Sequence, residues 1–176
     1  MRVTDESIAR VPRIESDVLD ERHWDTLQQK HRELLEYIRD DEFGTEAIAY
    51  YDFNMRELTK YKGPPGAGQV PSTRFNVPHI VMHTHPDGRT FTQRDVRRFL
   101  SNDNMLTLSA VGNDGSLYLL EKMPNFNLDA ADYMFAKESL NDEYYESPEK
   151  YVELMETFLG QLSSAGIRYK NWRRRI

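Results

Sequence analysis

The sequence predicts an α+β protein, a mixed α/β layer with a small central β-sheet flanked by helices. Apolar residues recur at helical spacing near both ends of the 176-residue chain. Between them lie short β-branched and aromatic runs bounded by turn residues, which is the pattern of strands. Hydrophobic residues make up 39% and charged residues 30%, as in a globular domain with a proper core.

The first elements follow from local patterns. Residues 1–20 show no sustained period, and we expect an extended N-terminal arm. Residues 21–40 place apolar side chains at steps of three and four, which predicts an amphipathic helix. A short aromatic run at 46–53 predicts a strand with 58–62 as its hairpin partner. The glycine- and proline-rich stretch 63–68 predicts a loop.

The later elements are marked by caps and turns. A buried-strand pattern at 79–83 stops at His85-Pro86, and Thr92 is a natural N-cap for a helix that runs to about Ser101. Gly-Asn-Asp-Gly joins two further predicted strands, and the rest of the chain is expected to be helical. The predicted ranges are 106–111 and 116–121 for the strands, and 129–140 and 147–166 for the helices. We therefore expect an arm (1–20), a metal-binding domain (21–122) and a helical extension packed on it (123–176).

Composition excludes several classes. The formal net charge of −6 makes non-specific nucleic-acid binding an unlikely default. Basic residues cluster at the C-terminus (Arg168, Lys170, Arg173, Arg174 and Arg175). A solvated tail is the commoner interpretation of such a run, and contact with a phosphate backbone or an acidic partner is the alternative. No segment has the apolar length of a membrane span or the pattern of a signal peptide, so we expect a cytoplasmic protein. With no cysteine, any metal must be bound by nitrogen and oxygen.

The stretch His83-Thr84-His85-Pro86 carries the chemistry. Residues two apart on a strand point to one face, so the two imidazoles can converge on one ion. Pro86 ends the strand directly afterwards, and Asp95 follows in the first turn of the next helix. Two histidines and a carboxylate, with a fourth position for water, are the ligand set of a catalytic zinc site.

A metal-free interpretation stands beside this one. Thr92 and Asp95 form a capping box with no metal required, and a histidine at a strand end is often an ordinary hydrogen-bonded residue. That alternative must explain three features together. The two histidines lie on the same face of a strand, the strand ends directly after them, and a carboxylate stands at the start of the next helix. The remaining histidines, His23, His31 and His79, are expected to be structural or exposed.

The stretch HTHPDGRTFTQRD resembles the His-x-His-Pro and Ser-x-x-Asp signature of the JAB/MPN (JAMM) metalloproteases. The resemblance covers about residues 21–122 and is closest to divergent bacterial and phage-associated members. It implies that Zn²⁺ is held by His83, His85 and Asp95. Thr92 stands where the family has its oxyanion-stabilising Ser, and the interval from His85 to Asp95 is one residue shorter than in eukaryotic members.

The resemblance also implies a general base, a glutamate on an earlier strand. Glu46 opens the strand 46–53 and is our choice over Glu42 and Glu57, which lie in turn and hairpin. The implied activity is zinc-dependent hydrolysis of a peptide or isopeptide bond, including bonds to a ubiquitin-like modifier. The implied partner is then a protein or peptide substrate.

Two other functions share features of this pattern. Amidohydrolase-type barrels also use His-x-His at a strand end, but they need about 250 residues, so size excludes them. A non-catalytic scaffold of the JAB/MPN fold, or a phage- or defence-associated binding protein that keeps the metal for structure alone, stays open as the alternative. Sequence identifies neither the substrate nor the oligomeric state.

Overall fold

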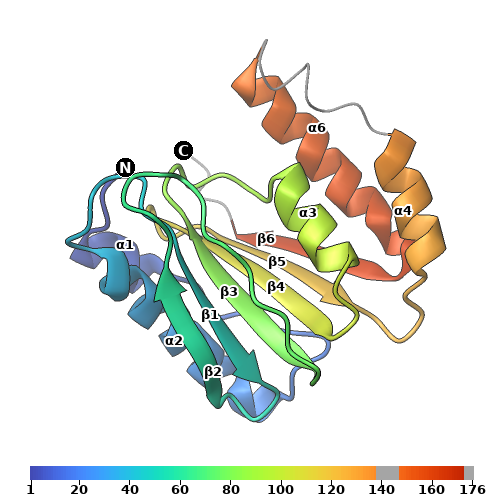
Figure 1. Cartoon of the computed structure of the whole chain (residues 1–176), viewed down its shortest axis with the longest axis horizontal. Helices are drawn as coiled ribbons and strands as arrows, with labels where there is room; N and C mark the ends of the chain where they lie inside the picture. Colours follow the sequence, from blue (N-terminus) through green and yellow to red (C-terminus); the bar gives the residue numbers. More distant parts are fainter. Residues whose placement is uncertain (138–146, 173–176) are drawn as a thin grey trace.

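The protein is built on a six-stranded mixed β-sheet with helices on both faces (Figure 1), which confirms the expected α+β class. The computed structural model describes residues 1–137 and 147–172. Along the sheet the strands follow the order β2-β1-β3-β4-β5-β6. Their bounds are β1 (Ala47–Asp52), β2 (Glu57–Lys62), β3 (His79–His85), β4 (Met105–Gly112), β5 (Leu117–Lys122) and β6 (Ile167–Trp172).

One strand pair is parallel and the others are antiparallel. β3 and β4 are parallel because a helix, α3, connects them across one face of the sheet. Short turns join β1 to β2 and β4 to β5 as antiparallel hairpins. Helices α1 and α2 cover one face, and α3, α4 and α6 cover the other (Figure 1). The helical bounds are α1 (Asp5–Arg10), η1 (Glu21–His23), α2 (Trp24–Ile38), α3 (Gln93–Leu100), α4 (Leu128–Lys137), α6 (Pro148–Gln161) and η2 (Leu162–Ala165).

The alternation of side chains along β3 divides the core in two. Ile80 and Met82 pack in the cluster under α1 and α2, whereas Val81 packs under α3 and α6. His83 and His85 have the parity of Val81 and therefore point to the α3 face. All seven residues of β3 are buried, so both imidazoles are held within the fold rather than displayed on its surface.

The N-terminal segment is not the extended arm that the sequence suggested. Thr4 caps the six-residue helix α1 through a reciprocal capping box with Ser7. The segment also places apolar side chains in the core under α2, among them the fully buried Ile14. Buried Glu121 of β5 accepts hydrogen bonds from the Ser16 hydroxyl and from the Asp17 N–H at 2.9 Å. The segment shows no hydrophobic period of its own, and these long-range contacts hold it in place.

The C-terminal segment is also more than the helical extension that was expected. Gly166 has a positive φ of 76° and ends the helical stretch. The chain then returns as β6 and pairs with β5, so the sheet of the supposed 21–122 domain includes residues from beyond it. Arg168 and Lys170 lie in β6 and form ion pairs with Asp17 at 3.4 and 2.9 Å, so they are not part of a free tail. Residues 173–175 of the basic run and 138–140 of the expected helix lie outside the described residues.

The length and hydropathy of a helix decide whether it can span a membrane. None of the helices within residues 1–137 and 147–172 is long and apolar enough to cross a bilayer.

Candidate metal centre

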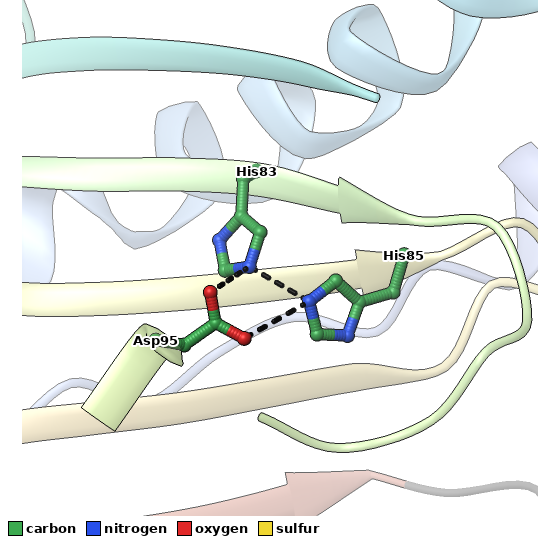
Figure 2. Close-up of side chains that lie close together, drawn as sticks. All are labelled: His83, His85 and Asp95. Carbon is green, nitrogen blue, oxygen red and sulfur yellow. Dashed lines mark hydrogen bonds and ion pairs between the residues drawn. The ribbon is translucent and has the colours of Figure 1, made fainter. Parts of the chain in front are cut away.

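His83, His85 and Asp95 converge on one point at the end of β3 and the start of α3 (Figure 2). The two Nε2 atoms are 2.8 Å apart. Asp95 Oδ1 lies 3.4 Å from His83 Nε2, and Asp95 Oδ2 lies 3.5 Å from His85 Nε2. Ligand atoms around a tetrahedral zinc are about 3.3 Å apart, as follows from bond lengths of about 2.0–2.2 Å. The spacing therefore fits a small divalent cation.

Backbone carbonyls fix the tautomer of both imidazoles. His83 Nδ1 lies 3.0 Å from the carbonyl oxygen of Ser109, and His85 Nδ1 lies 2.7 Å from that of Arg89. A carbonyl oxygen can only accept, so each Nδ1 carries a hydrogen and donates it. In the neutral rings both Nε2 lone pairs then face each other and the carboxylate. Three acceptors aimed at one point require a cation, either a metal ion or an extra proton.

Asp95 serves the helix and the centre at the same time. Oδ2 accepts hydrogen bonds from the Thr92 N–H at 2.8 Å and from the Thr92 hydroxyl at 2.7 Å, which completes the predicted capping box. The same Oδ2 also faces His85, while Oδ1 faces His83. The capping interpretation and the metal interpretation are therefore compatible, because one carboxylate has enough acceptor positions for both.

Ionisation in the centre reflects this coupling. Burial lowers the pKa of His83 and opposes the charged form of His85, but the hydrogen bond and charge of Asp95 outweigh burial at His85 and raise its pKa to about 9. Burial would raise the pKa of Asp95, yet the two histidines hold it well below its usual value. The Asp95 carboxylate therefore favours a positive charge between the two imidazoles.

Glu46 lies beside the centre, as the sequence reasoning expected. The Ala47 N–H donates to the Thr84 hydroxyl at 2.9 Å, which fixes the start of β1 against the end of β3. Partial burial raises the pKa of Glu46 to about 7, with a smaller opposing contribution from His85. A carboxyl group with a pKa near neutrality suits proton transfer at physiological pH.

Two adjoining cavities form a groove beside the centre. One cavity of about 330 Å³ is lined by Glu46, His85 and Asp95 together with residues of α3. A second cavity of about 320 Å³ shares Glu46 and His85 and continues towards the exposed Phe43. The loop 63–68 and the turn 87–91 border these cavities through Gly68 and Arg89. The centre is thus buried yet reachable through its carboxylate side.

The other predicted residues have varied settings. Thr92 lines both cavities, but its hydroxyl hydrogen is directed at Asp95, so an oxyanion role requires that hydroxyl to rotate. His31 and His79 are fully buried away from the centre, and His23 is partly exposed. His31 accepts or donates at Ser109 Oγ (2.6 Å) and at the Leu27 carbonyl, and burial lowers its pKa to about 4. It is structural, in agreement with the prediction.

Sequence reasoning missed the groups that orient the ligands and those that border the groove. Ser109 and Arg89 act through backbone carbonyls, for which no sequence signal exists. Arg94 and Arg98 line the cavity from α3, and Tyr151 lines it from α6. The arginines had a detectable signal, since QRDVRRF places three of them around the candidate ligand Asp95.

Comparison with known proteins gives no further guide to this centre. No protein-family model, no curated protein and no solved structure matches the chain significantly.

Proposed function

We propose that this chain is a zinc-dependent hydrolase of the JAB/MPN (JAMM) type that cleaves a peptide or isopeptide bond. The observation that carries the proposal is the convergence of three acceptor atoms, each oriented by a second interaction, at the floor of an open groove. The order of elements agrees with the resemblance: a helix, a strand opened by a glutamate, a hairpin, the His-x-His strand, a helix and two strands. Zinc suits the nitrogen and oxygen ligand set.

Each residue of the centre would have its own role in the reaction. His83 and His85 would hold zinc through Nε2 and Asp95 through its carboxylate, and His85 and Asp95 also line the groove. A zinc ion held here would polarise the scissile carbonyl and lower the pKa of a water ligand towards roughly 7. Glu46 takes the proton of the attacking water and delivers it to the leaving amine, as the new C–O bond forms and the C–N bond breaks. The Asp95 hydrogen bonds from Thr92 keep the carboxylate in place.

Metal content is the first test. The protein is produced without a polyhistidine tag or chelator, and zinc is measured by elemental analysis. We expect about one zinc per chain. The His83→Ala/His85→Ala variant is expected to lose it, whereas His23→Ala, which removes a partly exposed histidine outside the centre, is expected to keep it. Absence of zinc from the wild type, even after zinc is supplied, would remove the basis of the proposal.

Cleavage is measured next with internally quenched peptides and with an isopeptide-linked ubiquitin-like substrate. We expect 1,10-phenanthroline to abolish cleavage and added zinc to restore it. Full zinc occupancy with no cleavage of any substrate would favour the alternative, a non-catalytic scaffold in which the metal is structural.

A further inference from the structure

A row of arginines extends the groove from the metal centre along α3. Arg94 and Arg98 line the cavity that contains Glu46 and His85. Both also line a further cavity of about 220 Å³, together with Arg74 and Arg97. We call these four residues the basic track. The two cavities meet at Arg94 and Arg98, so the track begins at the centre and leads away from it.

The charges of the basic track are not neutralised. Within residues 1–137 and 147–172, no carboxylate forms an ion pair with any of the four guanidinium groups. Arg94 and Arg98 are four residues apart on one helix, where like charges repel and disfavour the helix. The chain has a net charge of −6, so a cluster of four arginines without ion pairs is unusual in it. Such a cluster indicates a binding site for a negatively charged ligand.

Two of the side chains are held in place without losing their binding capacity. Arg94 Nη1 donates to Gln69 Oε1 at 2.5 Å, and Arg98 Nη2 donates to the Val70 carbonyl at 3.0 Å. A guanidinium group has five N–H donors, so each retains several for a ligand. Neutral acceptors thus orient these two arginines without neutralising their charge. An anion-binding site needs side chains that are held in place before the ligand binds.

The adjoining cavity that shares Glu46 and His85 has a different lining. It is bordered by the exposed ring of Phe43 and by Val152. Along α3, Arg94 and Arg98 are four residues apart, which is a rise of about 6 Å at 1.5 Å per residue. An extended peptide advances about 3.3 Å per residue, so this part of the basic track matches about two residues. A polypeptide that lies across the centre would place apolar residues near Phe43 and at least two residues against the arginines.

We propose that the basic track binds an acidic segment of the polypeptide substrate, rich in Asp and Glu, on one side of the cleaved bond. The inference deepens the proposed function and rests on it for the identity of the ligand as a polypeptide. Arginine pairs with carboxylates in a bidentate manner, and four unpaired arginines can receive several acidic side chains. A nucleic acid fits less well, because its phosphates would also meet Glu46 and Asp95 and the net negative charge of the chain.

Binding is measured separately from cleavage, in the zinc-loaded Glu46→Gln protein. The probes are a fluorescein-labelled twelve-residue peptide of Glu, Asp and Ala, and a matched peptide of Gln, Asn and Ala, followed by fluorescence anisotropy. We expect the acidic peptide to bind at least about tenfold more tightly, and salt to weaken that preference. Arg94→Gln/Arg98→Gln is expected to abolish the preference. Arg22→Gln/Lys30→Gln, an equal charge change in η1 and α2 on the opposite face of the sheet, is expected to leave it intact.

Several outcomes would overturn the inference. They are equal binding of the two peptides, a preference that survives in Arg94→Gln/Arg98→Gln, and arginine-dependent binding of a labelled single-stranded oligonucleotide in preference to the acidic peptide. Circular dichroism and zinc content verify that the double variant is folded. If it is not, Arg74→Gln/Arg97→Gln, farther from Asp95, replaces it and is expected to weaken the acidic peptide severalfold. Failure of the proposed hydrolase activity would look different: acidic peptides would bind the protein that retains Glu46 without being cleaved.

Discussion

At the scale of single residues, the centre depends on which atom each side chain leaves free. The carbonyls of Ser109 and Arg89 occupy Nδ1 of the two histidines, so only Nε2 faces the centre. The cap of α3 holds Oδ2 of Asp95, and both carboxylate oxygens face the histidines. Equal parity on β3 predicted that the two histidines share a face. The choice of imidazole atom was not predictable, because it is made by backbone carbonyls, one in the following turn and one on the neighbouring strand β4.

Under the proposed function, replacement of Glu46 is expected to separate catalysis from metal binding. Glu46→Gln keeps the shape of the side chain but cannot accept the proton of water. We expect zinc content to be unchanged and kcat/KM on a cleaved peptide to fall by at least about 100-fold, the lower range for general-base catalysis. Glu57→Gln, at the exposed start of β2, is the matched control and is expected to be fully active. Full activity of Glu46→Gln would show that another group takes the proton.

The same variant has a predicted effect on stability. Partial burial raises the pKa of Glu46 from 4.5 in the unfolded chain to about 7, so the folded state binds the proton more tightly. Ionisation of Glu46 therefore costs stability as the pH rises from 4.5 through 7. In zinc-free protein, Glu46→Gln is expected to raise the free energy of unfolding by roughly 1–2 kcal/mol at pH 8, allowing for partial exposure, and to change it little at pH 4. Urea unfolding at both pH values measures the difference, and equal effects at both would contradict the assigned burial.

At the scale of elements, the N-terminal segment shows where local patterns fail. Residues 1–20 show no sustained period, but their apolar side chains fill the space under α2 and against the sheet. Glu121, near the end of β5, accepts its side-chain hydrogen bonds from Ser16 and Asp17 of this segment. The element therefore belongs to the core, although nothing in its own sequence identifies its partner.

Ile14 provides the test of that conclusion. Its side chain is fully buried, so Ile14→Ala is expected to lower the free energy of unfolding by about 2–4 kcal/mol through lost burial and the cavity left behind. Val77→Ala, at a position that is 47% exposed, is the control and should change it by less than about 0.5 kcal/mol. Chemical unfolding of both variants gives the comparison. A loss below about 1 kcal/mol for Ile14→Ala would mean that the segment is loosely attached.

At the scale of the whole molecule, the groove is made by parts distant in the sequence. Residues of the loop before β3, of α3 and of α6 border the cavities around Glu46 and His85. The sixth strand comes from the end of the chain and completes the sheet beside β5. A metal centre predicted from thirteen consecutive residues thus lies in a cleft that needs most of the protein.

This arrangement predicts how a shortened chain behaves. A fragment of residues 21–122 lacks β6, α6 and the N-terminal segment, and would expose the apolar residues of β5 on both faces. We expect it to show no cooperative thermal transition by circular dichroism, whereas the full chain shows one. A fragment that unfolds cooperatively would show that the first 20 and last 54 residues decorate an independent domain.

The sequence by itself determined the fold class, the seven helices and strands predicted within residues 21–122, and the three residues that converge at the centre. Those features depend on local periodicity, caps and spacing, which act over a few residues. Only the tertiary structure decided the place of the first 20 residues, the strand β6, the orientation of the imidazoles and the basic track. These depend on contacts between residues far apart in the chain, where burial and hydrogen bonding outweigh local preference.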